Sequence, residues 1–317
     1  MISLEALLQA RDTIGDTLAA TPILEDIGLS ERLGRRVLLK GELFQRTGSF
    51  KSRGALNWVR SASVNELNKG LGAVSAGNHA LGLAWAASIT GAKVTVVMPD
   101  NASPFKVAGT RKLGAKVILH GDINAAWEHM HWLVEERGLT LVHPYDDLRI
   151  IAGQGTVGLE IIEQAPEASV ILCPVGGGGL LSGIAIAARA LRPDIRLIGV
   201  EPQGAASMRH AWTHNGPCRL ASVDTCANSL GAAIVGEYTY PLCRQYIDEL
   251  VTVSEAGIAG ALRYLLSESK LFAEPGAAVG IAALLEGKVP DLPAQGDIVV
   301  VITGGNMGWE ELTAFLP

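Results

Sequence analysis

The amino-acid sequence predicts an α/β protein in which open, mostly parallel twisted sheets are flanked by helices. Short apolar runs rich in Val and Ile alternate with longer amphipathic stretches, which is the pattern of strands followed by helices. Several of these runs are apolar at every position, as expected for parallel strands that are covered on both faces. The 37 glycines among 317 residues favour tight turns between strand and helix.

The expected strands and helices alternate along the chain. The strand candidates are Val37–Lys40, Gly72–Ser75, Lys93–Pro99, Ala115–His120, Thr140–His143, Ser169–Val175, Arg196–Glu201 and Ile298–Thr303. The helix candidates are Met1–Thr13, His79–Thr90, Ala125–Arg137, Thr156–Ala165, Leu180–Leu191, Glu255–Ser269 and Ala277–Leu285. The stretch from about Val64 to about Asp147 could form a small sheet of four strands, and the flanking segments would then pair as a larger lobe.

Composition and charge restrict the class of protein. The chain has 48% hydrophobic and 18% charged residues, as in ordinary globular proteins. No stretch approaches the ~18 apolar residues that a membrane span requires. The net charge of −6 argues against nucleic acid as a partner, because phosphate binding needs clustered Lys and Arg. The N-terminus lacks the apolar core of a signal peptide, and the four cysteines show no CxxC spacing, so we expect reduced thiols and a cytoplasmic protein.

The first segment that suggests chemistry follows the strand expected to end near position 40. Thr47 or Ser49 could cap a helix that begins near Phe50. Lys51 and Arg53 then fall in the first helical turn, where the helix dipole disfavours positive charge and lowers the pKa of a lysine. Such a lysine can form an imine or act as a base. Two exposed cations that solvent tolerates would produce the same pattern.

A second segment, Ser75–Ala80, turns from a strand into a helix. Backbone N–H groups, the Ser75 hydroxyl and the Asn78 amide could together hold a carboxylate there without a fixed charge. A tight turn with Asn78 as a helix cap would explain the same residues. The spacing assigns no chemistry to the side chain of His79.

Four consecutive glycines, Gly176 to Gly179, stand between an apolar strand and an apolar helix. A loop of this kind exposes several N–H groups at the positive end of a helix, where a phosphate binds well. The loop does not end in Gly-Lys-Ser/Thr, and it lacks the last glycine of the dinucleotide fingerprint. Glu201 nevertheless ends the next strand where a ribose-binding acid would lie, so an NAD-dependent dehydrogenase is an alternative.

The fourth segment, Thr303–Asn306, ends the last expected strand. Thr303 would direct a hydroxyl toward the carboxyl edge of the sheet, although a plain strand end with turn glycines fits equally well. Ligands of open α/β sheets bind outside the carboxyl ends of the strands. Because all four segments follow strands, they predict a single site.

Together the four segments resemble the fold-type II pyridoxal-phosphate-dependent enzymes, the tryptophan-synthase-β-like fold type. Within it the chain is most similar to the serine/threonine dehydratase and serine racemase group. Further matches lie along nearly the whole chain, at Thr21–Leu24, Leu39–Glu42, Met98-Pro99 with Lys106, Gly114–Val117, His143–Asp147, Ala152–Thr156, Gly199–Pro202 and Glu274–Gly276. The resemblance implies two domains, a large cofactor-binding domain at residues 1–63 and 148–317 and a small domain at residues 64–147.

The resemblance also implies a role for each matching residue. Lys51 would hold pyridoxal 5'-phosphate as a Schiff base, with Phe50 packed on the ring. Lys51 and Ser75 would be the catalytic residues. Asn78 would bond the phenolic oxygen of the ring, and Thr303 would face the pyridine nitrogen. The remaining assignments are the phosphate cradle, Gly176, Gly177, Gly178 and Gly179, and the substrate-carboxylate site, Ser75, Ala76, Gly77, Asn78 and His79.

The implied reaction is β-elimination from a β-hydroxy amino acid such as L-threonine or L-serine, which yields a 2-oxo acid and ammonia. Lys51 would remove the Cα proton, and a neutral hydroxyl at Thr303 would favour prompt loss of the β-leaving group over a long-lived carbanion. The enzyme would be an ammonia-lyase, with 3-hydroxyaspartate or phenylserine as alternative substrates and serine racemase as an alternative activity. Racemases of the group resemble the pattern Ser-Ser-Gly-Asn-His, so Ala76 at the second position predicts little racemisation.

Two further expectations concern ions and partners. The group often has an Asp-containing stretch that helps to bind a divalent cation, but Asn228 replaces that aspartate here. Asp224 and the carbonyl of Ala227 could still hold Mg²⁺ or a monovalent cation, which leaves the metal site open. The family suggests a homodimer acting on a small amino acid. No regulatory tail follows the catalytic region, so feedback control by isoleucine is not expected.

Overall fold

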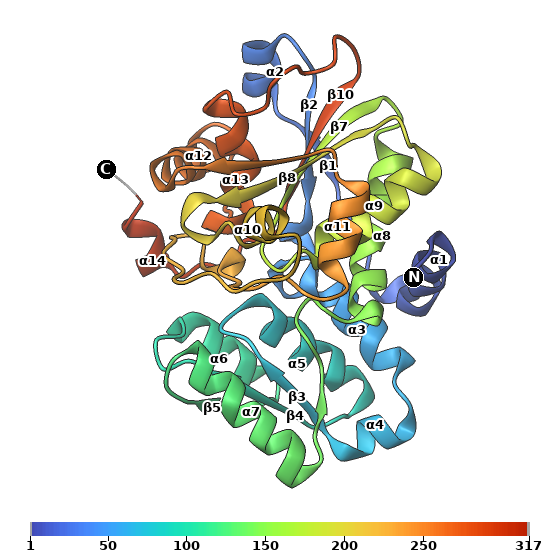
Figure 1. The fold of residues 1–317 in the computed structure, drawn as a ribbon, viewed down its shortest axis with the longest axis vertical. Helices are drawn as coiled ribbons and strands as arrows, with labels where there is room; N and C mark the ends of the chain where they lie inside the picture. Colours follow the sequence, from blue (N-terminus) through green and yellow to red (C-terminus); the bar gives the residue numbers. More distant parts are fainter. Residues whose placement is uncertain (1, 316–317) are drawn as a thin grey trace.

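The computed structural model describes residues 2–315 and divides their strands between two sheets, which form an upper and a lower lobe in Figure 1. The larger sheet has the strand order β1-β2-β10-β7-β8-β9, and the smaller sheet has the order β5-β4-β3-β6. The strands are β1 (Ile23–Glu25), β2 (Val37–Gly41), β3 (Leu71–Val74), β4 (Val94–Met98), β5 (Lys116–Leu119), β6 (Thr140–Leu141), β7 (Ala168–Pro174), β8 (Arg196–Pro202), β9 (Glu249–Val253) and β10 (Asp297–Ile302).

Helices cover both sheets. They are α1 (Leu4–Ile14), α2 (Ile27–Leu33), α3 (Lys51–Ser61), α4 (Val64–Lys69), α5 (Asn78–Thr90), α6 (Pro104–Lys112), α7 (Ile123–Arg137), α8 (Leu148–Gln164), α9 (Gly179–Leu191), α10 (Ser207–His214), α11 (Thr239–Tyr246), α12 (Glu255–Ser267), α13 (Pro275–Leu285) and α14 (Trp309–Thr313). Short 3₁₀ turns lie at Gly15–Thr17, Glu42–Phe44, Arg46–Gly48, Gln203–Ala205 and Asn228–Leu230.

The larger sheet is parallel except at its β1 edge, where β1 pairs antiparallel with β2. Alternate residues of the central strand β10 enter different cores. Ile298 and Val300 pack with α12 and α13, whereas Val299 and Val301 pack with α8 and α9. This burial on both faces explains why the strand is apolar at five successive positions.

The smaller sheet lies within residues 64–147 and is parallel throughout. Helix α5 packs on one face, where Leu83 meets Val96 in a shared core. Helix α7 covers the other face, where Met130 and Leu133 pack against Val97. The two lobes are therefore separate three-layer sandwiches. The domain boundaries expected at residues 64 and 148 stay a prediction.

Most predicted elements are present, with end points shifted by one or two residues. The edge strands β1 and β9 were not predicted, and the strand expected over Thr140–His143 ends at Leu141. The largest correction concerns α8, which begins at Leu148 rather than at the predicted Thr156. The glycines before Thr156 are helical, and they allow close contact with a neighbouring helix. A Cβ at Gly153 would lie 2.6 Å from the Cα of Gly54 in α3.

The N-terminal helix and the lengths of the helices test two further predictions. The expected N-terminal helix is present as α1, with Leu7 fully buried and Leu4 and Leu8 packed around it. Among residues 2–315, no helix is long and apolar enough to cross a membrane.

Candidate active site

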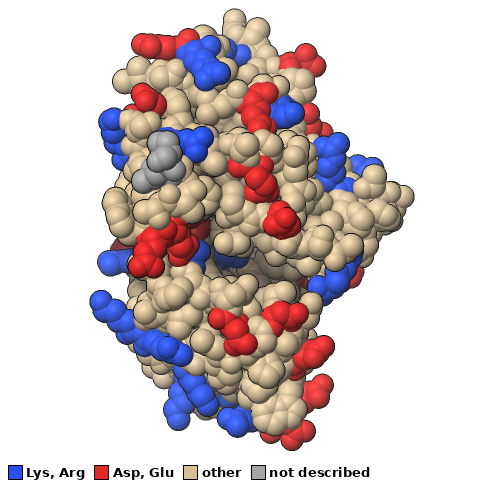
Figure 2. All heavy atoms as spheres, turned by 90° about the vertical axis from the view of Figure 1, so that its left-hand side faces the viewer, with Lys and Arg blue, Asp and Glu red and all other residues tan. Residues whose placement is uncertain are grey.

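The loops that follow β2, β3 and β10 are joined by hydrogen bonds. The Phe50 N–H donates to the Thr303 carbonyl at 3.1 Å. The side-chain amide of Asn306 donates to the Thr47 carbonyl at 2.6 Å and to the Asn78 side-chain carbonyl at 2.8 Å. Three of the four predicted segments therefore meet, between the lobes where Figure 2 shows a hollowed surface.

Helix α3 begins at Lys51 without the side-chain cap that the sequence suggested. Phe50, at the N-cap position, already has helical backbone angles, and neither Thr47 nor Ser49 caps the helix, so that prediction was wrong. Thr47 instead has a left-handed backbone, with φ of 61°. The hydroxyls of Thr47 and Ser49 are buried without a hydrogen-bond partner among the described residues. Two hydroxyl groups without hydrogen-bond partners thus lie within the four residues before Lys51.

The amine of Lys51 points to the connection between the lobes. Its Nζ donates to the Pro144 carbonyl at 2.7 Å and lies 5.2 Å from the centre of the Phe50 ring. Burial lowers the pKa of Lys51 to about 8, and the negative charge of Glu274 opposes part of that shift. Such an amine releases its proton far more readily than an ordinary lysine, as an imine-forming or basic lysine must.

Arg53, two residues further along α3, is in a different environment. Its guanidinium is 2% exposed and binds both Glu42 (2.7 and 2.8 Å) and Glu160 (2.6 and 2.9 Å). Burial alone would lower the pKa of Arg53, but the two carboxylates raise it instead. Arg53 is therefore a structural cation, and the interpretation of both residues as solvent-exposed charges was wrong.

The start of α5 is partly open to solvent. Ser75 Oγ accepts hydrogen bonds from the Gly77 N–H (3.1 Å) and the Ala80 N–H (3.3 Å), while Ser75, Ala76 and Gly77 are all partly exposed. His79 is buried, and its Nε2 lies 3.1 Å from the Val142 carbonyl. The N–H groups of Ala76, Asn78 and His79 donate to no described residue, and the His79 side chain is engaged with the backbone after β6.

Burial, reinforced by the positive charge of Lys51, lowers the pKa of His79 to about 3. The imidazole is therefore neutral at physiological pH. A contribution of this residue to substrate binding would have to come from its backbone at the positive end of α5.

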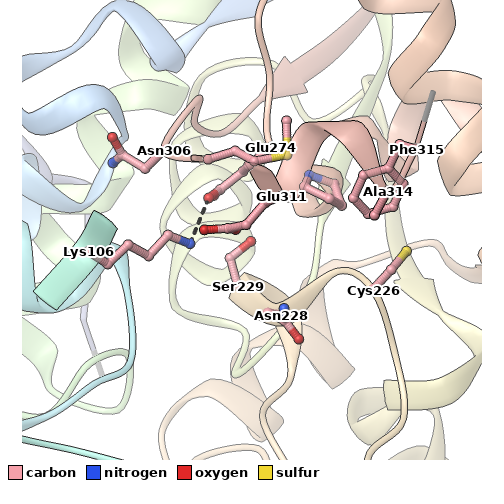
Figure 3. Close-up of a pocket in the computed structure, with 11 residues that line it drawn as sticks. Lys106, Cys226, Asn228, Ser229, Glu274, Asn306, Glu311, Ala314 and Phe315 are labelled. Atoms are coloured by element: carbon pink, nitrogen blue, oxygen red, sulfur yellow. Dashed lines mark hydrogen bonds and ion pairs between the residues drawn. The ribbon is translucent and has the colours of Figure 1, made fainter. Parts of the chain in front are cut away.

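Glu274 organises the residues around Asn78, and the sequence indicated it only as part of the matching Glu-Pro-Gly stretch. Its Oε1 accepts a hydrogen bond from the Asn78 amide at 2.5 Å, and its Oε2 lies 3.3 Å from Lys106 Nζ. Glu274 is 2% exposed. Figure 3 shows the ion pair of Lys106 and Glu274 in a pocket that Asn306 also lines. The volume of this cavity is about 220 Å³. The carboxylate thus connects the predicted site to this cavity.

The glycine loop after β7 has free donors. The N–H groups of Gly176, Gly177 and Gly178 donate to no described residue. Gly178, at the N-cap of α9, has φ of +91°, which favours glycine. Unpaired N–H groups at a helix N-terminus form an anion site.

Packing also requires glycine in this loop, for a reason that the sequence did not reveal. A Cβ at Gly177 would lie 2.3 Å from the ring of Tyr145, and one at Gly179 would lie 2.8 Å from the Tyr145 carbonyl. On the other side, Thr239 Oγ1 donates to the Gly177 carbonyl at 2.7 Å. Tyr145 and Thr239 therefore hold the loop in position.

Thr303 is 3% exposed and is fixed through its backbone bond to Phe50. Its hydroxyl makes no hydrogen bond to another described residue and is not sealed from solvent. A hydroxyl of a buried residue normally has a hydrogen-bond partner. The Thr303 hydroxyl has none among the described residues, so it is free to bond to a ligand.

Glu201, the acid on which the NAD-dependent alternative relied, is fully buried. Its two carboxylate oxygens accept hydrogen bonds from the N–H groups of Met208 (2.7 Å) and Arg209 (2.9 Å) at the start of α10. Burial raises the pKa of Glu201 to about 7. The carboxylate is occupied by the helix and cannot reach a ribose hydroxyl.

The predicted metal ligands Asp224 and Ala227 do not line the cavity beside Glu274, although Cys226 and Asn228, the neighbours of Ala227 in the chain, do. Asp224 is exposed, whereas Ala227 is buried with its carbonyl bonded to the Leu230 N–H at 2.8 Å. The described residues place no group of three metal-binding side chains around Asp224. A cation at these two residues stays a prediction.

Comparison with known proteins assigns the chain to a family. The family model "Pyridoxal-phosphate dependent enzyme" matches residues 14–304. The chain belongs to this family. It is 41% identical to an L-threonine ammonia-lyase of Thermotoga maritima over 97% of this chain and 76% of that protein. The crystal structure of T.th. threonine deaminase is 40% identical, with a TM-score of 0.90 over 97% of this chain and 99% of that one. Maize serine racemase is 32% identical, with a TM-score of 0.94 over 99% and 96%.

The residues of this pyridoxal-phosphate-dependent enzyme fit the cofactor of the family. An aldehyde needs an amine with a lowered pKa, which Lys51 provides. A phosphate needs several donors, and the N–H groups of Gly176 to Gly178 are free of described partners. A neutral pyridine nitrogen needs a donor, and the Thr303 hydroxyl has no other described partner. The match extends to the fold, since the two mostly parallel sheets agree with those of the threonine deaminase.

Proposed function

We propose that the protein is an ammonia-lyase that converts a β-hydroxy amino acid, L-threonine first and L-serine second, into a 2-oxo acid and ammonia. The observation that carries this proposal is the amine of Lys51, which has a lowered pKa and no carboxylate paired with it among the described residues. It lies at the edge where the loops after β2, β3 and β10 meet. The relatives named L-threonine ammonia-lyase and threonine deaminase are similar to the chain over nearly its whole length.

In this proposal the cofactor is held by residues from both lobes. Lys51 would hold its aldehyde group, Phe50 would pack on its ring, and the glycine loop would take its phosphate. Thr303 would donate its hydroxyl to the pyridine nitrogen, and Asn78, held by its bonds to Glu274 and Asn306, would donate to the phenolic oxygen. When bound, pyridoxal phosphate withdraws electrons from the substrate Cα–H bond.

The chain's own residues then position the substrate and move one proton. The backbone N–H groups of Ala76, Asn78 and His79, which donate to no described residue, hold the substrate carboxylate at the positive end of α5. The Lys51 amine accepts the Cα proton, the C–O bond at Cβ breaks, and the hydroxyl takes up one proton and leaves as water. The enamine that remains shifts a proton from nitrogen to Cβ and becomes an imine, and water hydrolyses its C=N bond to give a 2-oxo acid and ammonia. Ser75, which the resemblance paired with Lys51, positions this turn because its Oγ accepts hydrogen bonds from the Gly77 and Ala80 N–H groups.

Serine racemisation is the second candidate, because the maize serine racemase shares the fold. A racemase must also protonate Cα from the face opposite Lys51. Ala76 lies at the open turn where such a donor would belong, and its methyl group carries no proton to give. We therefore expect elimination to exceed racemisation by a wide margin.

A substrate panel tests the proposal. Purified holoenzyme is assayed for ammonia and 2-oxo acid with L-threonine, L-serine, 3-hydroxyaspartate and phenylserine, and for D-serine by chiral chromatography. The expected result is the highest kcat/KM for L-threonine and only traces of D-serine. Racemisation as fast as 2-oxo acid release, or a preference for 3-hydroxyaspartate or phenylserine, would contradict it.

A chemical measurement tests the attachment independently of turnover. Borohydride reduction of holoenzyme should bleach its visible absorbance and leave a pyridoxyl group on the peptide that contains Lys51, as read by mass spectrometry. A modified peptide elsewhere in the chain would overturn the role of Lys51. Colourless protein that binds NADH would favour the dehydrogenase.

The proposal extends to assembly and compartment. We propose a homodimer in the cytoplasm, on the family resemblance and on the four cysteines, which are all free in the described structure. Light scattering at several protein concentrations should give twice the chain mass of 33.3 kDa, and the chain mass itself would contradict the dimer.

A further inference from the structure

Helix α10 and the turn after it bring together three side chains that bind transition metals. His210 and His214 are one turn apart on the helix, with ring centres 4.1 Å apart. Cys218 follows in the loop. The ligand atoms that these three residues offer all lie within 4.8 Å of one another. None of the three takes part in the site described above.

The local backbone explains how Cys218 reaches the histidines. Asn215, directly after the helix, has a left-handed backbone with φ of 57°, which reverses the chain. The Gly216 N–H then donates to the Ala211 carbonyl at 3.1 Å. This closed helix end carries the following residues back toward the last turn of α10, where His214 lies.

A backbone contact sets the tautomer of one histidine. Nδ1 of His214 lies 2.8 Å from the His210 carbonyl. A carbonyl oxygen only accepts hydrogen bonds, so Nδ1 carries the proton and Nε2 keeps its lone pair. A metal-bound histidine normally has this arrangement, with its second nitrogen donating to a carbonyl or carboxylate.

We propose that His210, His214 and Cys218 form a binding site for a divalent transition metal of the zinc class. Two imidazoles and one thiolate are ligands that zinc and cobalt prefer, whereas magnesium and calcium need oxygen. Tetrahedral zinc requires its ligand atoms to be about 3.5 Å apart, which modest side-chain rotations from the present spacing reach. The carboxyl end of α10 also favours a cation. The fourth position is open to water at the partly exposed surface.

The first turn of α10 contacts the glycine loop after β7, and this contact indicates what a metal at the other end of the helix would stabilise. Ser207 Oγ donates to the Gly176 carbonyl at 3.4 Å. A Cβ at Gly178 would lie 2.8 Å from the Met208 side chain, so the helix packs directly on the glycine loop. A metal that fixes the last turn of α10 would therefore stabilise a helix whose first turn contacts that loop. The metal site itself does not depend on the proposed reaction.

Cobalt binding tests the ligand set. Metal-free holoenzyme titrated with Co²⁺ should develop a near-ultraviolet band for charge transfer from thiolate to cobalt, measured as a difference spectrum. Cys218→Ser should abolish the band, and His214→Gln should weaken the affinity at least about tenfold. Cys226→Ser, which removes another free cysteine of intermediate exposure, should leave the band unchanged. A missing band, or one that persists in Cys218→Ser, would overturn the proposal.

Alkylation of the unmodified chain gives a second readout. Zn²⁺ should slow the reaction of Cys218 with iodoacetamide at least about tenfold, measured by peptide mass spectrometry. Cys226, whose pKa burial raises to about 12, should react at the same slow rate with and without the metal. Equal rates for Cys218 in both samples would exclude the site, because a metal-bound thiolate is protected.

Discussion

Lys51 and Arg53 are two residues apart in the first turn of α3, but their surroundings give them opposite properties. Arg53 binds Glu42 and Glu160 through four hydrogen bonds, and the carboxylates keep it charged. Lys51 donates to a single carbonyl, of Pro144, and burial moves its pKa toward neutrality. Burial with carboxylate partners makes a cation structural, whereas burial without them makes it reactive.

The comparison extends to the elements that supply the partners. The Arg53 network comes from the segment after β2 and from α8, both in the larger lobe. The surroundings of Lys51 include Pro144, which lies on the connection from the smaller lobe. The charged network therefore fixes α3 within one lobe, and the reactive amine faces the other.

The largest expected effect is that of Lys51→Ala. Loss of the proton acceptor and of the covalent attachment should reduce kcat by at least about 10⁴-fold. The midpoint of urea unfolding of the cofactor-free protein should change little, because the amine makes one hydrogen bond. A variant that retains substantial 2-oxo acid formation would show that Lys51 is not the base.

Arg53→Met should do the reverse and destabilise the fold. Removing the guanidinium leaves the buried Glu42 without its cationic partner and with only the hydrogen bond from the Thr21 hydroxyl, which costs about 3–5 kcal/mol. Urea unfolding followed by circular dichroism measures the change in free energy. The matched control is Arg32→Met, at an exposed arginine, and it should be nearly neutral. An equally small effect at Arg53 would mean that the network contributes nothing to stability.

The reactivity of Lys51 should depend on pH with a midpoint of about 8. Only the unprotonated amine reacts with an acylating reagent, so labelling of cofactor-free protein should rise with pH. Well below the midpoint the rise is about tenfold per pH unit. Mass spectrometry of the labelled peptide gives the profile, and exposed Lys69 serves as the reference in the same sample. A midpoint near that of an ordinary lysine would remove the contrast with Arg53.

A smaller shift is expected from Glu274→Gln. The Glu274 carboxylate favours the charged form of Lys51, so its removal should lower the midpoint of the same labelling profile below about 8. Glu311→Gln changes another carboxylate of the cavity, one that accepts a hydrogen bond from Ser103, and should leave the profile unchanged. An upward shift in Glu274→Gln would reverse the assigned sign.

The sequence predicted the strands that are buried on both faces, because a run such as Ile298–Ile302 is apolar at every position. Such a run is unfavourable with either face exposed to water. It did not predict β1 or β9, because strands at the edge of a sheet need a less continuous run of apolar residues. The helix that it predicted from Thr156 is shorter than α8, which begins at Leu148. The glycines of α8 resemble those of a loop until the contact between Gly153 and Gly54 is known.

For the site, the sequence by itself determined that four segments follow strands, and because the carboxyl ends of parallel strands share one edge, it predicted that these segments carry the chemistry. Only the tertiary structure decided that Arg53 is paired, that Glu274 holds Asn78, and that Tyr145 requires glycine at position 177. These contacts join residues from about 10 to nearly 200 positions apart. Burial and partner geometry at such separations follow from how the two lobes pack, which no local pattern of residues encodes.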